Sequence, residues 1–215
     1  ISSITLLTLS WPPYLGGPSI YTAFIPLFFY ERRIHSKSLI KKYLLTFSGF
    51  FLVLFSYGFL VSYKAWGEYN NNVYLAILVA FLPLSLVVSL FSLFKKNTYR
   101  YLFLIFSWST MEILQMNWEL NSPLLMLGNS LCMYPGLIQH FSVWGVPGGA
   151  HHILSLNVIL FLILLKAGSK SLFKKEIAVL ALLLLPVLGS IISYSFPLEP
   201  DKTITAGITI GNFEH

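Results

Sequence analysis

The sequence predicts an all-α integral membrane protein of about seven transmembrane helices, followed by the first strand of a further domain. Composition is the first reason: 56% of the 215 residues are hydrophobic and only 10% are charged. Soluble domains carry about 25% charged residues, so this chain has too few to cover a surface that faces water. The second reason is the recurrence of apolar runs close to the roughly 20 residues that a helix needs to cross a bilayer.

Positive charge supplies the third reason and also an orientation. Twelve of the fourteen Lys and Arg residues fall in three clusters, within residues 32–42, 95–100 and 166–175. The loops that alternate with these clusters carry almost none, which is the positive-inside pattern of a polytopic membrane protein. We therefore expect the clusters to face the cytoplasm, and the net charge of +6 needs no nucleic acid as a partner.

Proline and polar residues divide the apolar runs into spans. Residues 1–10 have the composition of the end of a first span, which Trp11, Pro12 and Pro13 interrupt. Because the chain begins without Met, we expect a cytoplasmic start and part of this span to be missing. Six further spans are predicted, at 14–30, 43–63, 73–94, 101–117, 143–165 and 177–194. The first of these is just long enough to cross the bilayer again.

The C-terminal end changes character after the last span. With cytoplasmic basic clusters, seven spans place this end on the extracytoplasmic side. Tryptophan favours the membrane interface, and four of the five tryptophans lie near this outer side, at positions 11, 66, 118 and 144. Residues 196–202 form a polar linker with two prolines, and residues 203–215 alternate apolar with polar or small residues like a β-strand. One strand is not stable alone, so we expect a transmembrane domain at 1–195 and a truncated extracytoplasmic domain after it.

Glu112 is the first candidate functional residue because it lies deep in the fifth span, where an ionisable group is costly. It shares one helix face with Gln115 and Glu119. One interpretation is structural, with a protonated Glu112 bonded to Asn157 on the sixth span. The other is that this face shapes a cavity that faces a ligand.

The outer segment 116–142 is the second candidate. It lacks Lys and Arg, yet about half of it is apolar, which is unusual for a loop exposed to water. A re-entrant or interfacial segment that admits lipid acyl chains is one interpretation, and a lid that merely covers helix ends is the other.

Metal and catalytic motifs are not evident. His151 and His152 are adjacent, so on a helix they point about 100° apart, whereas chelation favours a spacing of three or four. Cys132 is the single cysteine, no nucleophile–base arrangement is visible, and no phosphate-binding glycine loop occurs. We therefore predict no metal site, no cofactor and no catalytic residue in this chain.

Four stretches, taken together, resemble bacterial apolipoprotein N-acyltransferases. They are LSWPPYLGGPSIYTAFIPLFFYERR (9–33), FSWSTMEILQMNWELNSPLLMLGN (106–129), GLIQHFSVWGVPGGAHHILSLNVILFLILLK (136–166) and ITAGITIGNFEH (204–215). The likeness covers nearly the whole chain in the right order. Each motif alone is weak, but four in sequence are fairly specific.

The resemblance implies transfer of an acyl chain from a phospholipid to the N-terminal cysteine amine of an apolipoprotein, at the outer face of the bacterial inner membrane. The family's Glu–Lys–Cys triad lies in a nitrilase-like domain after the seventh span, so residues 203–215 would be the first strand of that α/β domain. Cys132 does not match the nucleophile. Positions that match the membrane-domain pattern are Glu112, Trp118, Pro123, Gly128, Gln139, Gly145, Gly149 and Asn157.

Four of these positions, together with Glu119 at the polar outer end of the fifth span, are predicted to bind substrate or shape a cavity: Glu112, Trp118, Glu119, Gln139 and Asn157. Three positions depart from the family pattern. Leu124 stands where a Trp is expected, Pro147 where an aromatic or similar residue is expected, and Ile210 where a Gln is usual. These changes leave open a divergent paralogue with altered or lost activity.

Two other functional classes remain open at this stage. One is a non-catalytic membrane anchor or partner module that recruits another membrane enzyme, such as a polyprenyl-phosphate glycosyltransferase. The other is a small transporter, which usually shows a pair of broken helices at the bilayer midplane. Pro83 and Pro186 interrupt two spans but do not form a matched pair.

Overall fold

The computed structural model describes residues 1–11, 14, 16–66, 71–118, 126–166 and 174–196. All regular structure within these ranges is helical. The predicted linker from residue 197 and the predicted strand at 203–215 lie outside the described residues, as do Glu119 and Pro123.

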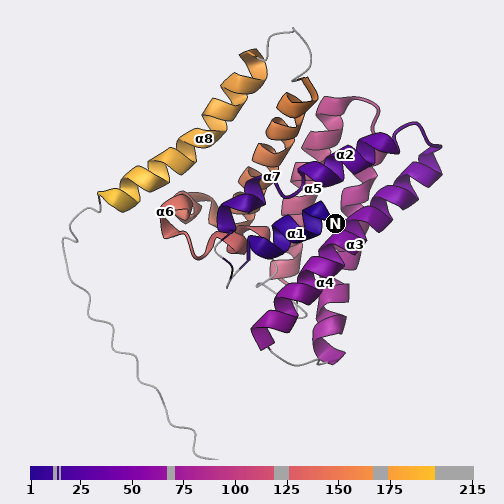
Figure 1. Cartoon of the computed structure of the whole chain (residues 1–215), viewed down its shortest axis with the longest axis horizontal. Coiled ribbons are helices and arrows are strands. Elements are labelled where there is room, and N and C mark those ends of the chain that lie inside the picture. Colours follow the sequence, from indigo (N-terminus) through magenta and orange to yellow (C-terminus); the bar gives the residue numbers. More distant parts are fainter. Residues whose placement is uncertain (12–13, 15, 67–70, 119–125, 167–173, 197–215) are drawn as a thin grey trace, which may run out of the picture.

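Five long helices form the body of the protein: α3 (Leu39–Trp66), α4 (Asn71–Ser89), α5 (Asn97–Met116), α7 (Phe141–Lys166) and α8 (Lys174–Ser195). Their positions follow the last five predicted spans. Helix α4 continues into the short 3₁₀ helix η2 (Leu90–Leu93). Figure 1 shows the order in space: α3 packs on α4, α4 on α5, α5 on α7, and α7 on α8.

Four helical stretches among the described residues are long and apolar enough to cross a membrane: Leu39–Tyr63, Tyr74–Leu93, Phe141–Lys166 and Lys175–Ser195. Helix α5 has 20 residues, but Arg100 and Glu112 interrupt its apolar sequence. The structure therefore supports a polytopic membrane protein and does not by itself establish seven spans.

The predicted span at 14–30 is wrong as a single helix. After α1 (Ser2–Leu9) the chain forms a 3₁₀ turn, η1 (Gly17–Tyr21), and then begins a separate helix, α2 (Ile25–Arg33). Pro18 and Pro26 explain the break, because proline donates no backbone hydrogen bond and clashes with the preceding turn of a continuous helix. Each proline instead lies at the start of a new element, where its missing N–H costs nothing.

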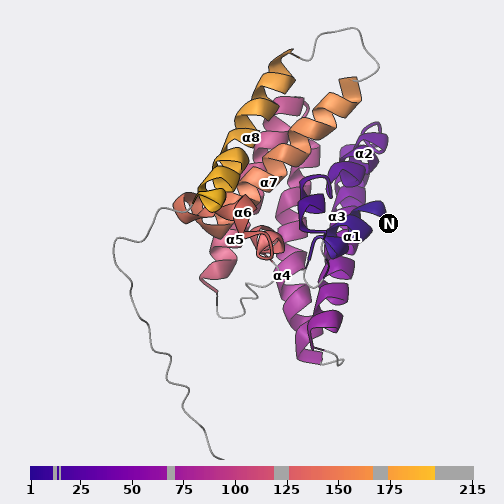
Figure 2. The same cartoon turned by 60° about the vertical axis from the view of Figure 1, so that its left-hand side comes forward.

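The helix ends that border the basic clusters lie toward one end of the bundle (Figure 1). In Figure 1 the α2–α3 connection, the α4–α5 connection, the end of α7 and the start of α8 all point toward the upper side. Figure 2, turned by 60°, keeps the end of α7 and the start of α8 there. This clustering agrees with the charge distribution along the sequence.

A buried ion pair holds this basic end together. Arg100 on α5 pairs with Glu31 on α2, and both side chains are almost fully buried. Arg100 Nη1 also lies 3.3 Å from His35 Nδ1, and the guanidinium is 5.4 Å from the ring of Phe91 and 5.5 Å from that of Tyr101. Arg100, which makes α5 less apolar, is therefore paired with a carboxylate and packed against aromatic rings inside the protein.

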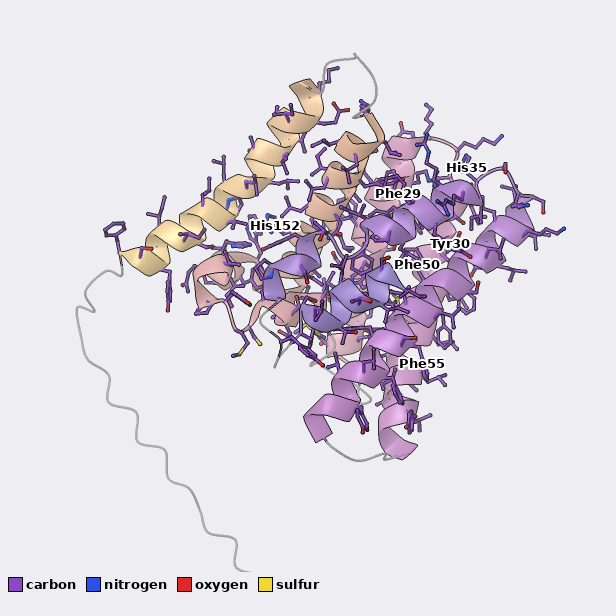
Figure 3. The ribbon with its side chains drawn as sticks, viewed as in Figure 1. Phe29, Tyr30, His35, Phe50, Phe55 and His152 are labelled. Carbon is purple, nitrogen blue, oxygen red and sulfur yellow. The ribbon has the colours of Figure 1, made fainter. Side chains whose placement is uncertain are left out.

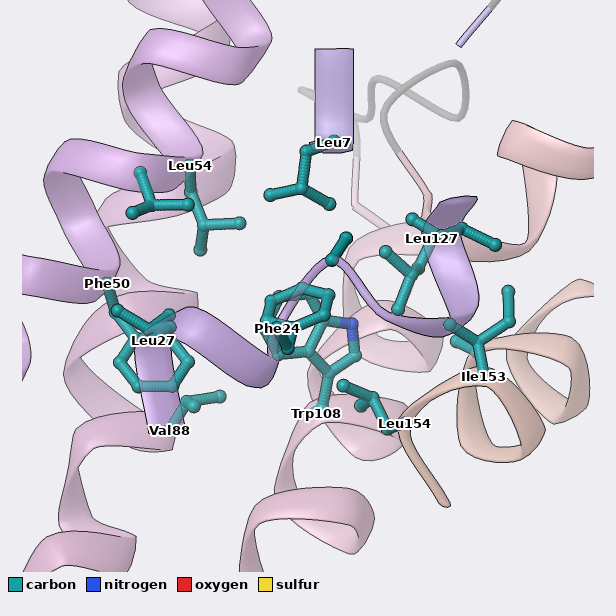
Figure 4. Packing of buried hydrophobic residues seen from close by; sticks show 14 of the residues in the cluster. Leu7, Phe24, Leu27, Phe50, Leu54, Val88, Trp108, Leu127, Ile153 and Leu154 are labelled. Carbon is teal, nitrogen blue, oxygen red and sulfur yellow. The ribbon is translucent and has the colours of Figure 1, made fainter. Parts of the chain in front are cut away.

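The hydrophobic core lies where α1, η1 and α2 meet the long helices. Phe24, at the start of α2, packs edge-to-face on Trp108 of α5, with ring centroids 5.2 Å apart. Figure 4 shows these rings among buried side chains from several elements: Leu7, Leu27, Phe50, Leu54, Val88, Leu127, Ile153 and Leu154. The broken N-terminal segment is thus part of the core and not a surface loop.

We predict that Arg100→Gln destabilises the protein by about 3–5 kcal/mol, because it leaves the Glu31 carboxylate buried without its partner. The double replacement Arg100→Met with Glu31→Leu should recover most of that loss, since it removes both buried charges. Thermal melting in detergent measures both effects, with Lys95→Gln as an exposed basic control. Equal melting temperatures for the single and double variants would contradict a pair that is stabilised by mutual charge.

Candidate functional site

Asn157 on α7 supplies the hydrogen bonds that the break between η1 and α2 leaves open. Its Oδ1 accepts from the backbone N–H of Phe24 at 2.9 Å, and its Nδ2 donates to the carbonyls of Ile20 and Ile153, each at 2.9 Å. The side chain is fully buried. Non-helical backbone at membrane depth is tolerated only where the protein satisfies its polar groups, and this amide does so.

Glu112 on α5 likewise accepts a backbone hydrogen bond, in this case from the outer segment. Its Oε1 accepts from the indole N–H of Trp108 and from the backbone N–H of Leu127, both at 2.9 Å. Leu127 is the first residue of η4 (Leu127–Leu131), a 3₁₀ turn within the outer segment. The carboxyl group therefore ties this turn to the middle of the bundle.

The other carboxyl oxygen of Glu112 is the unusual feature. Oε2 is buried and has no hydrogen-bond partner in the described part of the chain, and the same holds for the hydroxyl of Tyr57 on α3. Buried polar atoms are normally hydrogen-bonded, so each of these two groups marks a candidate position for water or a ligand group.

Two aromatic rings join the Asn157 and Glu112 networks. Asn157 accepts a hydrogen bond from the backbone of Phe24, and Trp108 donates to Glu112. The rings of Phe24 and Trp108 pack on each other (Figure 4). The predicted direct bond between Glu112 and Asn157 is wrong, because each side chain is bound to backbone from another segment. The two residues nevertheless lie at opposite ends of one continuous network.

The described part of the outer segment packs on protein. Met126, Leu127 and Leu131 are buried, and η4 contacts the start of α7 so closely that a Cβ at Gly128 would lie 2.6 Å from the Val146 carbonyl oxygen. This closeness explains the glycine at this position. The described residues thus agree with a segment that is folded back against the bundle, and admission of a lipid remains a proposal.

Helix α7 bends at its start for a local reason. Gly145 has φ +69°, a left-handed conformation that other residues adopt only at a cost, and Pro147 follows two positions later. The short α6 (Pro135–Ile138) precedes this bend and packs on α8. The bend redirects the chain from the outer segment into the long helix that carries Asn157.

The remaining predicted residues do not join this network through any bond that the structure shows. Gln139 is exposed and donates to the Pro135 carbonyl at 2.8 Å, and Trp118 is half-exposed at the end of α5. Gln115 donates to the Ala80 carbonyl on α4, away from the partners of Glu112. Glu119 lies outside the described residues.

His151 and His152 face different helices. His152 is hydrogen-bonded through Nε2 to the Leu183 carbonyl on α8 at 2.7 Å, whereas His151 Nδ1 lies 3.5 Å from Ser109 Oγ on α5. Within the described ranges no group of three or more His, Cys, Asp or Glu residues is arranged to hold a metal ion.

Sequence reasoning missed His140, which lies between α6 and α7 and contacts α8. Its Nδ1 is 2.8 Å and its backbone nitrogen 3.0 Å from Ser190 Oγ, and its ring lies 4.9 Å from that of His152. Burial, and then the nearby His152, lower the pKa of His140 from 6.5 to about 4. No local motif marks this residue, because its partners are 12 and 50 positions away.

The comparisons with known proteins agree with this architecture. The family model described as apolipoprotein N-acyltransferase N-terminal domain matches residues 3–159, a range that contains both Glu112 and Asn157. Neither a curated protein nor a solved structure matches this chain.

We predict that the protein loses stability as the pH falls from about 6.5 toward 4. The folded pKa of His140 is lower than its unfolded value near 6.5, so the unfolded state binds more protons in this window. Stability from the neutral ring is present above pH 6.5 and is lost on acidification. Melting temperatures of the parent and of His140→Asn, measured from pH 7.5 to 4.5, test this expectation.

His140→Asn keeps a side-chain N–H near Ser190 and removes the titrating ring, so its melting temperature should depend less on pH. Parallel curves of melting temperature against pH for the two proteins would show that His140 does not contribute to the loss of stability at low pH.

Proposed function

Because the chain belongs to the apolipoprotein N-acyltransferase N-terminal domain family, we propose that it is the membrane domain of an apolipoprotein N-acyltransferase-like enzyme. The reaction is transfer of an acyl chain from a phospholipid to the N-terminal cysteine amine of a bacterial lipoprotein. The family match over residues 3–159 is the observation that carries this proposal. The apolar helices and the buried network around Glu112 and Asn157 are consistent with it.

In this proposal the chain positions the reaction and does not perform it. A cysteine thiolate outside residues 1–215 attacks the ester carbonyl of the phospholipid, and lysophospholipid leaves. The amine of the lipoprotein then attacks the thioester, an amide forms and the thiol is restored. Glu112 would act as a positioning residue, since its Oε1 already binds Trp108 and Leu127 and so holds the outer segment in place.

Orientation follows from the same proposal. The basic end of the bundle would face the cytoplasm, and the outer segment, with residues 203–215, would face the extracytoplasmic side of the inner membrane. The gathering of the basic helix ends on one side of the fold supports this orientation (Figure 1).

A non-catalytic membrane module, which anchors or recruits another enzyme, is the alternative. One observation favours it: the polar groups of Asn157 and one oxygen of Glu112 are fully engaged by the protein's own backbone and indole. Such a module would keep the fold and lack acyl transfer in any context.

We predict that residues 1–215 alone do not transfer acyl chains, and that the full-length gene product does. Transfer from a labelled phospholipid to a diacylglyceryl-cysteine peptide measures both. Turnover by the isolated residues 1–215, or its absence in an intact and folded full-length protein, would refute the enzyme assignment as stated here.

Two variants of the full-length protein separate the roles of Glu112. Glu112→Gln keeps an oxygen acceptor for Trp108 and Leu127, so we expect near-normal melting, whereas Glu112→Ala should lose about 1–3 kcal/mol. Acyl transfer should fall with Ala and persist with Gln if the role is positioning. Unchanged acylation and melting in both variants would remove Glu112 from the functional site.

A further inference from the structure

The basic end of the bundle contains two buried cations beside a single buried carboxylate. Arg100 on α5 pairs with Glu31 on α2, and they are 4% and 1% exposed. Lys42, in the first turn of α3, is also only 3% exposed, yet neither of the two ion pairs that the described residues form includes it. Burying a charge without a partner is costly. A negative charge is therefore missing beside Lys42.

Arg100 is enclosed by protein groups. Glu31 lies at its Nη2, and His35 Nδ1 lies 3.3 Å from its Nη1. The rings of Phe91 and Tyr101 lie 5.4 and 5.5 Å from the guanidinium. The positive charge of Arg100 therefore acts on its surroundings, but the guanidinium is shielded from a ligand.

His35 lies at the connection between α2 and α3 and is exposed (Figure 3). An arginine can only donate, so the Nδ1 beside Arg100 is an acceptor and the hydrogen of the neutral ring is on Nε2. Partial burial, and then the positive charges of Lys42 and Arg100, lower the pKa of His35, although Glu31 acts in the opposite direction. The ring is therefore neutral at pH 7 and presents an Nε2–H donor near these charges.

The N-terminus of α3 adds further donors at the same place. The helix begins at Leu39, four residues after His35. Unpaired N–H groups and the helix dipole make a helix N-terminus positive, so acidic side chains are favoured there. The first turn of α3 instead contains Lys41 and Lys42 and no acidic residue. An anion at this position would satisfy the helix end, Lys42 and His35 together.

We propose that a phosphate group binds between His35 and the first turn of α3. Its oxygens accept from Lys42 Nζ, from the Nε2–H of His35 and from the backbone N–H groups of the helix end. A phosphate suits these donors because its oxygens accept from several directions at once. The charge of Arg100 offsets the repulsion from Glu31. The phosphate belongs either to a lipid headgroup at the membrane surface or to a soluble molecule.

Acyl transfer is not involved in this binding, so the test uses the 215-residue chain itself. Melting is measured in a maltoside detergent, which contains no phosphate. Inorganic phosphate at about 10 mM should raise the melting temperature by about 3–5 °C over sodium chloride of equal ionic strength, which corresponds to a dissociation constant of about 1 mM.

The two sources of phosphate are separated by adding phosphatidylglycerol to the same micelles, with a diacylglycerol of the same chains as the control that lacks phosphate. A lipid source predicts stabilisation by phosphatidylglycerol and a reduced response to inorganic phosphate in its presence. A soluble source predicts that the response to inorganic phosphate persists and that phosphatidylglycerol adds nothing. No stabilisation by either phosphate compound, or equal stabilisation by the diacylglycerol, would overturn the proposal.

Lys42→Met and Lys41→Met are a matched pair of variants at adjacent positions. Lys42→Met removes the buried charge and keeps an unbranched side chain, so without phosphate it should melt no lower than the parent, and it should lose the response to phosphate. Lys41 is exposed, so Lys41→Met should keep that response. A full response in a folded Lys42→Met protein would contradict the proposed site.

His35→Phe keeps an aromatic ring and removes the Nε2–H donor. Its melting-temperature response to phosphate should fall to roughly half, because one of the donors to the anion is lost. If Lys42→Met fails to fold, this variant decides alone, and an undiminished response in it would overturn the proposal.

Discussion

The fold depends on one constraint, which is that backbone polar groups at membrane depth must find partners inside the protein. Helices meet this requirement within themselves, but the η1–α2 break and the η4 turn do not. Asn157 binds the backbone of Ile20 and Phe24 at the first, and Glu112 binds Leu127 at the second. These two side chains allow irregular segments to lie in the centre of a helical bundle.

Packing and hydrogen bonding reinforce each other around these two residues. Phe24 is hydrogen-bonded to Asn157, Trp108 is hydrogen-bonded to Glu112, and the two rings pack on one another. A displacement of the η1–α2 break would therefore also displace Trp108 and its hydrogen bond to Glu112. The described part of the outer segment is thereby placed against α5 and α7. Among the described residues, Oε2 of Glu112 has no hydrogen-bond partner, so this oxygen of the network is a candidate position for water or a ligand group.

Sequence reasoning succeeded where the signal is local and failed where it is not. Length and hydropathy locate α3, α4, α7 and α8, because an apolar run of membrane length has few alternatives. The break near Pro18 was missed because apolar composition continues through it. Asn157 is bonded to Phe24, 133 positions away, and not to Glu112, and no local pattern in the sequence reveals that pairing. The contact of His140 with His152 likewise depends on the bend at Gly145, which no periodicity reveals.

Hydrogen exchange resolved to single backbone amides tests the role of Asn157 and Glu112 most directly. We expect the amides of Phe24 and Leu127 to exchange as slowly as those inside the long helices, although each donates to a side-chain oxygen and not to a carbonyl of its own helix. Asn157→Leu should accelerate Phe24 selectively, and Glu112→Ala should accelerate Leu127. If both amides exchanged in the parent protein as fast as an exposed loop, the two side chains could not be what holds these segments in the bundle.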